Sequence, residues 1–568
     1  MVTTSSTVCS HEGASPMNGL LLAVVVVVWL VIAYRWYGGL IDRKIVRPDD
    51  SRKPPSCDMY DGVDYCPGSR PVLFGHHFSS IAGAGPIIGP VAAVAAFGWG
   101  ASLLWIALGV VFFGAVHDYV SLMVSVRHGG KSLPDIARDV VGKRARLLFM
   151  LFVWFALILI IAVFAVVASR TLESTPQVVI PTFAIVPIAA LFGWATHRMK
   201  LPVAVGTVIS LALLALSIYL GFRYPLSLPY AGNAAFATWM VLLIAYGFIA
   251  SVLPVWVLLQ PRDYISTWVL VLGMLLGFAG LAMTRPALNA PFFTGWSSAT
   301  SGPLWPMLFI LIACGAISGF HSLVAGGTTS KQLTKETDGK PIGFGAMLAE
   351  GAVATLALVC VAGGLKWAAP ESSPESFLGI LKAGGPIKAF GAGYGAVTAP
   401  ILTAAIGTLV GITMLKTFVM TTLDTTVRIT RFITTELFAD RVPLLRNRFA
   451  ASAVGVVGAF LLGMSGGWSV LWPVFAAANQ LVAALTLIVL TAYLVGVRKP
   501  SKFTLYPAIF MLATTMGALL WQGYGFFFPS DGGSVNLTLG IASVVLLGLG
   551  AMVAAEAPRS LRMARSSR

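Results

Sequence analysis

The chain has 568 residues, of which 57% are hydrophobic and 11% are charged. A soluble domain carries about 25% charged residues, so this composition excludes a protein folded around a single water-covered core. The formal net charge of +16 at pH 7 would by itself suit a nucleic-acid-binding protein. The basic residues instead gather between apolar runs, so the charge indicates membrane orientation and no nucleic-acid partner is expected.

Apolar runs of roughly 20 residues, each long enough to cross a bilayer, recur along the chain. They predict an all-α polytopic membrane protein with about 15 transmembrane helices. The expected spans lie near residues 18–35, 77–98, 101–125, 147–169, 179–195, 202–222, 236–259, 265–284, 304–326, 344–366, 391–420, 449–464, 469–496, 504–523 and 537–555.

Alternating the sides of the connecting segments places most lysines and arginines on one side of the membrane, which the positive-inside rule makes cytoplasmic. The other side holds Arg170, Arg223, Arg285, Lys366, Lys382 and Lys388. We therefore expect the N-terminus outside and the C-terminus in the cytoplasm. The first span, GLLLAVVVVVWLVIAY, has no basic stretch before it, so we expect a retained helix and not a signal peptide.

The connecting segments are short, and none has the length of a soluble domain. Residues 36–76 are expected to form a cytoplasmic loop. In residues 127–146, SLPDIARDVVGKRAR spaces Leu133, Ile136, Val140 and Val141 along one stripe, which is typical of an amphipathic helix at the inner surface. An ordinary basic loop is the alternative.

The stretch GHHFSSIAGAGPIIGP, residues 75–90, places glycines and prolines at apparent membrane depth, where they disfavour a continuous helix. Irregular backbone survives in a membrane only where it is buried in protein or lines a cavity, and broken helices are typical of secondary-transport sites. The alternative is that small residues permit close helix packing. The candidate substrate-binding residues here are Ser79, Ser80, Ala82, Gly83, Ala84 and Gly85.

A second break is expected in FATWMVLLIAYGFIASVLPVWVLLQPRD, residues 236–263, because Pro254 stands in mid-span. This segment would run in the opposite sense to the first, as an inverted 5+5 repeat requires. Ser251 and Pro254 become further candidate substrate contacts. The expected division is an extra N-terminal helix (1–35), the cytoplasmic loop (36–76), two inverted repeats of five helices (77–222 and 223–425), and C-terminal helices with a tail (426–568).

Titratable side chains also occur at membrane depth. His117 and Asp118 lie in FFGAVHDYVSLMVS, where an ionised aspartate costs about 2.5–3.5 kcal/mol on insertion scales. Histidine titrates near neutral pH, so these two residues, with His76 and His77, form a candidate proton-handling cluster. The alternative is an interfacial pair that reaches water. Adjacent histidines on a helix point about 100° apart, and no metal site is expected.

The segment ACGAISGFHSLVAGGTTSKQ carries further candidates for ion coupling, namely His321, Thr328, Thr329 and Lys331. Its hydroxyl groups could hold a small cation, or Lys331 could replace one. Helix capping and loop solvation are the alternative. Asp424 is expected to close a helix end, and Asn479 to hydrogen-bond between helices.

Motifs of catalysis are not found: there is no Gly-x-Ser-x-Gly elbow, no His-Glu-x-x-His and no phosphate-binding loop ending in Gly-Lys-Ser/Thr. Neither an enzyme nor an ATP-driven pump is expected, and no cofactor is expected. A membrane receptor for an external nutrient is disfavoured, because no cytoplasmic signalling domain is present in the sequence.

Seven blocks together resemble the carbon starvation (CstA) family of bacterial inner-membrane transporters. They are DGVDYCP (61–67), LFGHHFSSIAGAGPIIGP (73–90), GAVHDY (114–119), LLQPRDY (258–264), SGFHSLVAGGTTSKQ (318–332), TTLDTTVRITRF (421–432) and LWPVFAAANQLVA (471–483). The resemblance implies a multi-pass protein of the inner membrane with a LeuT-type core, as in the amino acid–polyamine–organocation superfamily.

The resemblance also implies a function that the residue pattern alone does not specify. Family members resemble importers of peptides or pyruvate induced when carbon runs short, and the pyruvate branch looks proton-coupled. We therefore expect a secondary transporter that imports pyruvate or short peptides with protons. The alternatives are a sodium-coupled symporter of another small organic nutrient and a nutrient-sensing receptor. The oligomeric state is left open.

Overall fold

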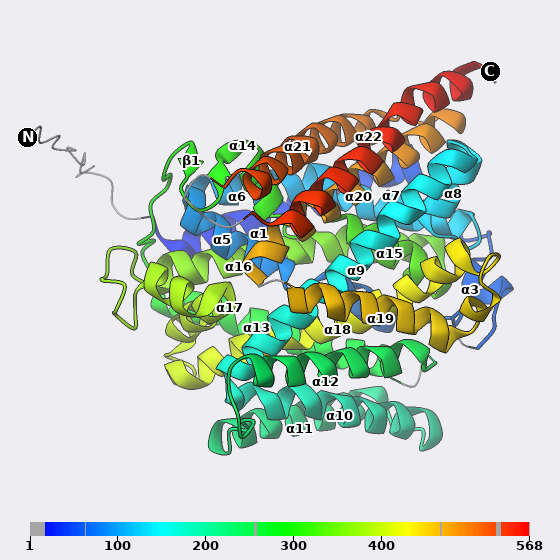
Figure 1. The fold of residues 1–568 in the computed structure, drawn as a ribbon. Helices are drawn as coiled ribbons and strands as arrows, with labels where there is room; N and C mark the ends of the chain where they lie inside the picture. Colours follow the sequence, from blue (N-terminus) through cyan, green and yellow to red (C-terminus); the bar gives the residue numbers. More distant parts are fainter. Residues whose placement is uncertain (1–16, 63, 255–257, 466–467, 530–534, 567–568) are drawn as a thin grey trace, which may run out of the picture.

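Long apolar helices lie side by side throughout the computed structural model, which describes residues 17–62, 64–254, 258–465, 468–529 and 535–566 (Figure 1). The first half contains α1 (Gly19–Arg35), α2 (Tyr37–Ile41), α3 (Pro55–Asp58), α4 (Arg70–Ile81), α5 (Gly85–Phe97), α6 (Trp99–Gly109), α7 (Ala115–Arg127), α8 (Leu133–Val140), α9 (Lys143–Ser174), α10 (Val179–Arg198), α11 (Val203–Arg223), α12 (Asn233–Val252) and α13 (Leu259–Thr284). The second half contains α14 (Leu304–Leu311), α15 (Gly319–Gly327), α16 (Ala346–Gly364), α17 (Phe377–Thr398), α18 (Ala404–Phe438), α19 (Arg448–Ser465), α20 (Trp468–Gly496), α21 (Lys502–Phe527) and α22 (Leu537–Ser566). A small hairpin pairs β1 (Ser297–Ser298) with β2 (Gly302–Pro303).

The lengths and composition of these helices confirm a multi-pass membrane protein. Within the described ranges, 12 helices are long and apolar enough to cross a membrane, or 13 if the bent pair of α4 and α5 counts as one span. The number expected from the sequence was about 15, because apolar runs at 304–326 and 449–464 were counted as full spans. In the structure the first run is divided between α14 and α15, and the second is a shorter apolar helix, Arg448–Met464.

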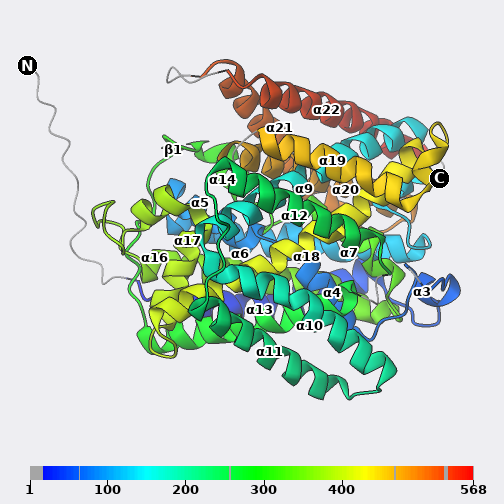
Figure 2. The same cartoon turned by 60° about the horizontal axis from the view of Figure 1, so that its bottom comes forward.

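The centre of the bundle is formed by α9, α18 and α20. The most apolar windows of α9 and α18 are 72% buried and that of α20 is 94% buried, against 28% for α1 and α11. The hairpin of α10 and α11 lies at one edge, and α21 and α22 lie at the opposite edge (Figures 1 and 2). On α11, Val208, Leu216 and Tyr219 are exposed, as expected for a helix that faces lipid.

The first predicted break is confirmed. Helix α4 ends at Ile81, α5 begins at Gly85, and the two helices meet at an angle of 40°. Pro86 lies in the first turn of α5, where a proline is tolerated because its missing N–H would have no helical partner. The break is buried, so its backbone is shielded from lipid by protein, as irregular structure at this depth requires.

The second break was predicted at the wrong place. Helix α12 ends at Val252 and α13 begins at Leu259, so Pro254 lies in a connection between two helices and not inside one span. A proline that ends a helix and a proline that interrupts one look alike in an apolar sequence. The interruption of the second half lies instead at residues 312–318, between α14 and α15.

The predicted amphipathic helix within residues 127–146 is present as α8. Leu133 and Ile136 are buried, and α8 packs against α9 and α20. Its apolar stripe is therefore covered by protein.

Candidate functional site

The two interrupted helices lie against each other in opposite directions. Helix α5 contacts α14 and α4 contacts α15, which is the pairing of an antiparallel arrangement. The approach is close, because a Cβ atom added to Gly89 of α5 would lie 2.4 Å from the backbone oxygen of Leu311 at the end of α14. The structure therefore brings the two breaks, 82–84 and 312–318, to one place inside the bundle.

Side chains from the central helices complete the walls of the two breaks. From α18, the Thr422 hydroxyl donates a hydrogen bond to the Ser80 carbonyl oxygen (3.3 Å). From α20, Asn479 Oδ1 accepts a hydrogen bond from the Phe320 N–H (2.9 Å), in the first turn of α15. Because the first N–H groups of a helix have no partner within the helix, Asn479 acts as a cap for α15.

A continuous chain of titratable groups begins beside these breaks. Asp118 on α7 joins two histidines: its Oδ1 lies 2.7 Å from His117 Nδ1, and its Oδ2 lies 2.7 Å from His321 Nδ1 on α15. The other ring nitrogen of His321 lies 3.4 Å from Glu350 Oε2 on α16. All four side chains are completely buried. The chain has the order imidazole, carboxylate, imidazole, carboxylate, which can pass a proton between neighbouring groups.

The two adjacent histidines of α4 have different partners. His77 Nδ1 lies 2.8 Å from the Thr329 hydroxyl, just beyond α15. His76 Nδ1 lies 2.6 Å from Asp263 Oδ2 on α13. Asp263 in turn binds Arg262, which also binds Asp424 of α18. His77 therefore belongs to the interface between the two broken helices, and His76 belongs to a separate charged network.

Buried polar atoms without a hydrogen-bond partner gather around the breaks and the titratable chain. Within the part of the chain that the structure describes, they include His77 Nε2, Ser80 Oγ, His117 Nε2 and both carboxylate oxygens of Glu350. Polar groups buried in this way are costly unless they bind water, a ligand or a proton. In the same ranges, no group of three or more His, Cys, Asp or Glu side chains is arranged as a metal site.

The structure brings together most of the residues singled out from the sequence. The residues at or beside the two breaks are Ser79, Ser80, Ala82, Gly83, Ala84, Gly85, His77, His321 and Thr329. His117 and Asp118 join them through His321 and do not lie at a water-exposed end, because both are completely buried.

Several predicted residues lie elsewhere. Ser251 is in the last turn of α12, where its hydroxyl pairs with Ser452 (3.0 Å), and Pro254 follows in the connection to α13. Lys331 lies over the rings of Phe432 (4.5 Å) and Tyr65 (5.2 Å), beyond the end of α15. It therefore does not occupy a cation position at the breaks. The Thr328 hydroxyl donates within its own turn, to the Val324 carbonyl oxygen (2.9 Å).

Three buried polar residues have surroundings that differ from those expected or were given no role from the sequence. Glu350 was visible as a single acid in the apolar run MLAEGAVATLAL, but nothing in the sequence joined it to His321. Asn479 was expected only to link helices, and its cap on α15 was missed. Asp424 does not close a helix end as expected, because it lies buried within α18 beside Arg262.

The loop that leads into α4 is tied to α18. Asp64 Oδ1 lies 3.2 Å from Arg428 Nη1 and 3.8 Å from Arg431 Nη2. Arg428 also donates to the backbone oxygens of Ala250 and Leu253 at the end of α12. The side chain of Asp64 is 20% exposed, so this tie lies near the surface, unlike the fully buried chain around Asp118.

Known proteins are similar in sequence to this chain over most of its length. The family model described as "Carbon starvation protein CstA" matches residues 18–372 and 371–518. The peptide transporter CstA of Campylobacter jejuni is 33% identical over 567 residues, covering 89% of this chain and 80% of the relative. The pyruvate/proton symporter BtsT of Escherichia coli is 33% identical over 587 residues, covering 89% of this chain and 81% of the relative.

Two solved structures have weaker similarity. A manganese transporter of Eremococcus coleocola matches 89% of this chain and 99% of its own at 13% identity and a TM-score of 0.49. MhsT in complex with L-phenylalanine matches 85% of this chain and 99% of its own, at 15% identity and a TM-score of 0.49. The family model and the relatives cover nearly the whole helical bundle, and the chain belongs to the carbon starvation protein CstA family.

Proposed function

We propose that this chain is a secondary transporter that imports pyruvate or a short peptide together with protons when nutrients are scarce. The observation that carries the proposal is the meeting of two antiparallel broken helices beside the buried His117–Asp118–His321–Glu350 chain. Broken helices of this kind hold the substrate near the middle of the membrane in many transporters. The names of the relatives, a peptide transporter and a pyruvate/proton symporter, support the same substrate classes.

The start of α5 is the proposed site for the substrate carboxylate. Helix N-termini attract anions, because their first N–H groups and the helix dipole both favour negative charge. The start of α15 is already capped by Asn479, whereas α5 has no side-chain cap. Ser80 Oγ, which has no partner in the described part of the chain, would add a hydroxyl donor beside it.

The titratable chain is the proposed route for the coupled proton. His321 lies in the first turn after the second break, so its protonation state changes the charge next to the substrate. From His321 the proton can move to Asp118 and His117 through hydrogen bonds, and Glu350, 3.4 Å away and not hydrogen-bonded to His321, is the next nearest acceptor. No cation ligand set is needed for this route, and Lys331 takes no part in it.

We further propose a LeuT-type 5+5 core whose second repeat begins at α14, not at residue 223. The helices of the two repeats would be α4/α5, α6/α7, α9, α12 and α13, and then α14/α15, α16, α18, α19 and α20. The packing supports this pairing, because each contact of one repeat has a counterpart in the other: α4 packs on α13 as α14 packs on α20, and α5 packs on α16 as α15 packs on α7. Likewise, α12 packs on α18 as α19 packs on α9.

In this arrangement α10, α11 and α17 are additions to the core. If α14/α15 and α19 also cross the membrane, the number of spans is the 15 expected from the sequence. The basic end, which carries α3 and α8, would then face the cytoplasm of a bacterial inner membrane, with the N-terminus outside and the C-terminus inside.

Uptake of radiolabelled pyruvate into proteoliposomes tests the proposed function. With an inward proton gradient, pyruvate should accumulate above its external concentration, and a protonophore should abolish the accumulation. Unlabelled dipeptides and tripeptides, added as competitors, identify the substrate class. Accumulation that requires a sodium gradient and ignores the pH gradient would refute proton coupling. Equilibration without accumulation would indicate a facilitator.

A further inference from the structure

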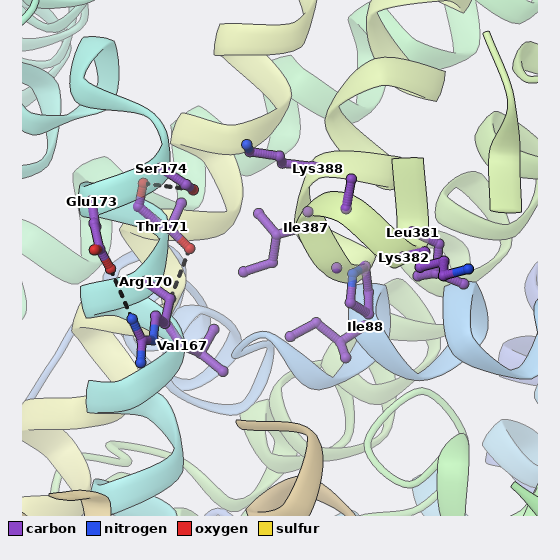
Figure 3. A pocket seen from close by; sticks show the side chains of 14 residues that line it. Ile88, Val167, Arg170, Thr171, Glu173, Ser174, Leu381, Lys382, Ile387 and Lys388 are labelled. Carbon is purple, nitrogen blue, oxygen red and sulfur yellow. Dashed lines mark hydrogen bonds and ion pairs between the residues drawn. The ribbon is translucent and has the colours of Figure 1, made fainter. Parts of the chain in front are cut away.

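A cavity of about 300 Å³ lies between α5, α9 and α17, away from the titratable chain. Residues 167–174 of α9 form one wall and residues 381–388 of α17 form the other (Figure 3). Ile88 of α5 contributes to the lining. By the charge pattern of the sequence, this is the outer side of the membrane.

The charged side chains in the lining of this cavity are mostly basic, and Glu173 is the acidic one. Of the six lysines and arginines expected on the outer side, three line it, namely Arg170, Lys382 and Lys388. Arg170 is paired with Glu173 (3.0 Å), and Lys382 is paired with Glu371 (2.9 Å), as Figure 3 shows for the first pair. Within the described ranges, Lys388 has no hydrogen bond or ion pair. It is the charge in the cavity that is free to bind an anion.

The backbone of α17 holds Lys388 in place. The helix is kinked at Gly385, whose φ of 73° favours glycine. The lysine stem packs over the preceding Gly384, where an added Cβ atom would lie 2.1 Å from Lys388 Cδ. Two consecutive glycines therefore make the room that Lys388 needs.

Measured along α5 and α9, this cavity is about one helical turn from the first break. The Phe164 ring on α9 lies against Gly83 in the break and packs edge-on against Phe475 of α20 at 5.6 Å between ring centroids. Val167, which lines the cavity, is three residues further along α9, about 4.5 Å along the helix axis. Ile88 is likewise three residues after the first residue of α5. A molecule in the cavity is thus about one helical turn from the proposed carboxylate site.

We propose that this cavity is an outer binding site for the carboxylate of the substrate, with Lys388 as its ion-pair partner and Phe164 as the barrier to the inner site. The inference rests on the proposed function for the identity of the substrate. The volume accommodates pyruvate or a short peptide, and the unpaired ammonium selects for an anionic end. The charges of Arg170 and Lys382 are offset by Glu173 and Glu371, so the net positive charge at the cavity is that of Lys388.

Two kinetic variants test the role of Lys388. Lys388→Gln should raise the KM for pyruvate uptake about five-fold and leave the maximal rate unchanged, as for loss of one partly exposed ion pair. Gly384→Ala keeps the charge but displaces the lysine stem, so it should raise the KM in the same direction. Lys366→Gln is the matched control, because Lys366 lies on the same side, is paired with Glu375 (2.6 Å) and does not line the cavity.

A chemical test separates this inference from the proposed function, because it needs no transport. In a Lys388→Cys variant, pyruvate or a dipeptide should slow modification of the new thiol by an aminoethyl methanethiosulfonate reagent, with no such protection at Lys366→Cys. The modification restores a positive charge and should return the KM toward that of the wild type. Modification with methyl methanethiosulfonate, which adds an uncharged group, should not.

The outcomes distinguish the two proposals. Normal uptake by the wild type, with unchanged KM in Lys388→Gln and no protection of Lys388→Cys, would overturn the outer site and leave the proposed function intact. Protection without any uptake would support the outer site and overturn the proposed function. Equal protection at positions 388 and 366 would show nonspecific screening of the reagent and would also overturn the outer site.

Discussion

Removal of the Arg262 guanidinium should strongly destabilise the bundle. Arg262 is completely buried, and one of its nitrogens lies 2.5 Å from Asp263 Oδ1 and 3.0 Å from Asp424 Oδ1. An Arg262→Met variant fills a similar volume but leaves Asp424 with the Tyr246 hydroxyl (2.9 Å) as its one hydrogen-bond partner among the described residues. Breaking a buried ion pair from one side costs about 3–5 kcal/mol, because the remaining charge is uncompensated.

A second substitution tests whether the uncompensated charge is the cause. Asp424→Asn in the Arg262→Met background removes that charge and should recover more than half of the lost stability, although Asp424→Asn alone should destabilise the protein. His76 remains as a partner for Asp263 in both variants (2.6 Å). The two substitutions should therefore be strongly non-additive.

The assay is thermal denaturation of the purified protein in detergent, followed by tryptophan fluorescence and by the fraction that elutes as a monodisperse peak. Wild type, both single variants and the double variant are compared at one pH and one salt concentration. An Arg262→Met protein that unfolds at the wild-type temperature would refute the reasoning. A double variant no more stable than Arg262→Met would refute it as well.

Three further perturbations probe other parts of the molecule. Glu350→Gln should reduce proton-driven pyruvate accumulation about ten-fold and spare exchange of internal for external pyruvate, and equal loss of both activities would contradict a coupling role. Gly89→Ala would place its methyl group 2.4 Å from the Leu311 backbone oxygen and should cost about 1–3 kcal/mol in detergent denaturation, unlike Gly548→Ala, which meets no atom within 4 Å. Burial and three neighbouring arginines lower the pKa of Lys499, which lies between two spans, to about 8. The unfolded chain then binds more protons above pH 8, so the melting temperature of the wild type relative to Lys499→Met should rise from pH 7.5 to 9.5, and parallel curves would contradict this.

The sequence predicted those features whose cause is local. The break at 82–84 was recognisable because glycines and prolines flank it within one apolar run. The break at 312–318 was not, since LIACGAISGF contains no proline and its glycines are common in membrane helices. At Pro254 the error was the reverse: an interruption was predicted where a helix simply ends. Nothing in the sequence distinguishes these two cases.

The assembly of the site depends on contacts between distant parts of the chain. His117, Asp118 and His321 were each expected to handle protons, but their connection through the two oxygens of Asp118 joins α7 to α15 and required the fold. Glu350 was missed for the same reason. Its role depends on α16 packing beside α15, and the sequence shows only one acid in an apolar helix.

The ion pair of Asp64 with Arg428 connects positions that are 364 residues apart. The loop that carries Asp64 leads into α4, and Arg428 belongs to α18. The ion pair therefore attaches one arm of the first broken helix to a central helix of the bundle. Because Asp64 is 20% exposed, dissolved salt weakens this ion pair, and the attachment of the α4 arm to α18 varies with the ionic strength of the medium at this end of the bundle.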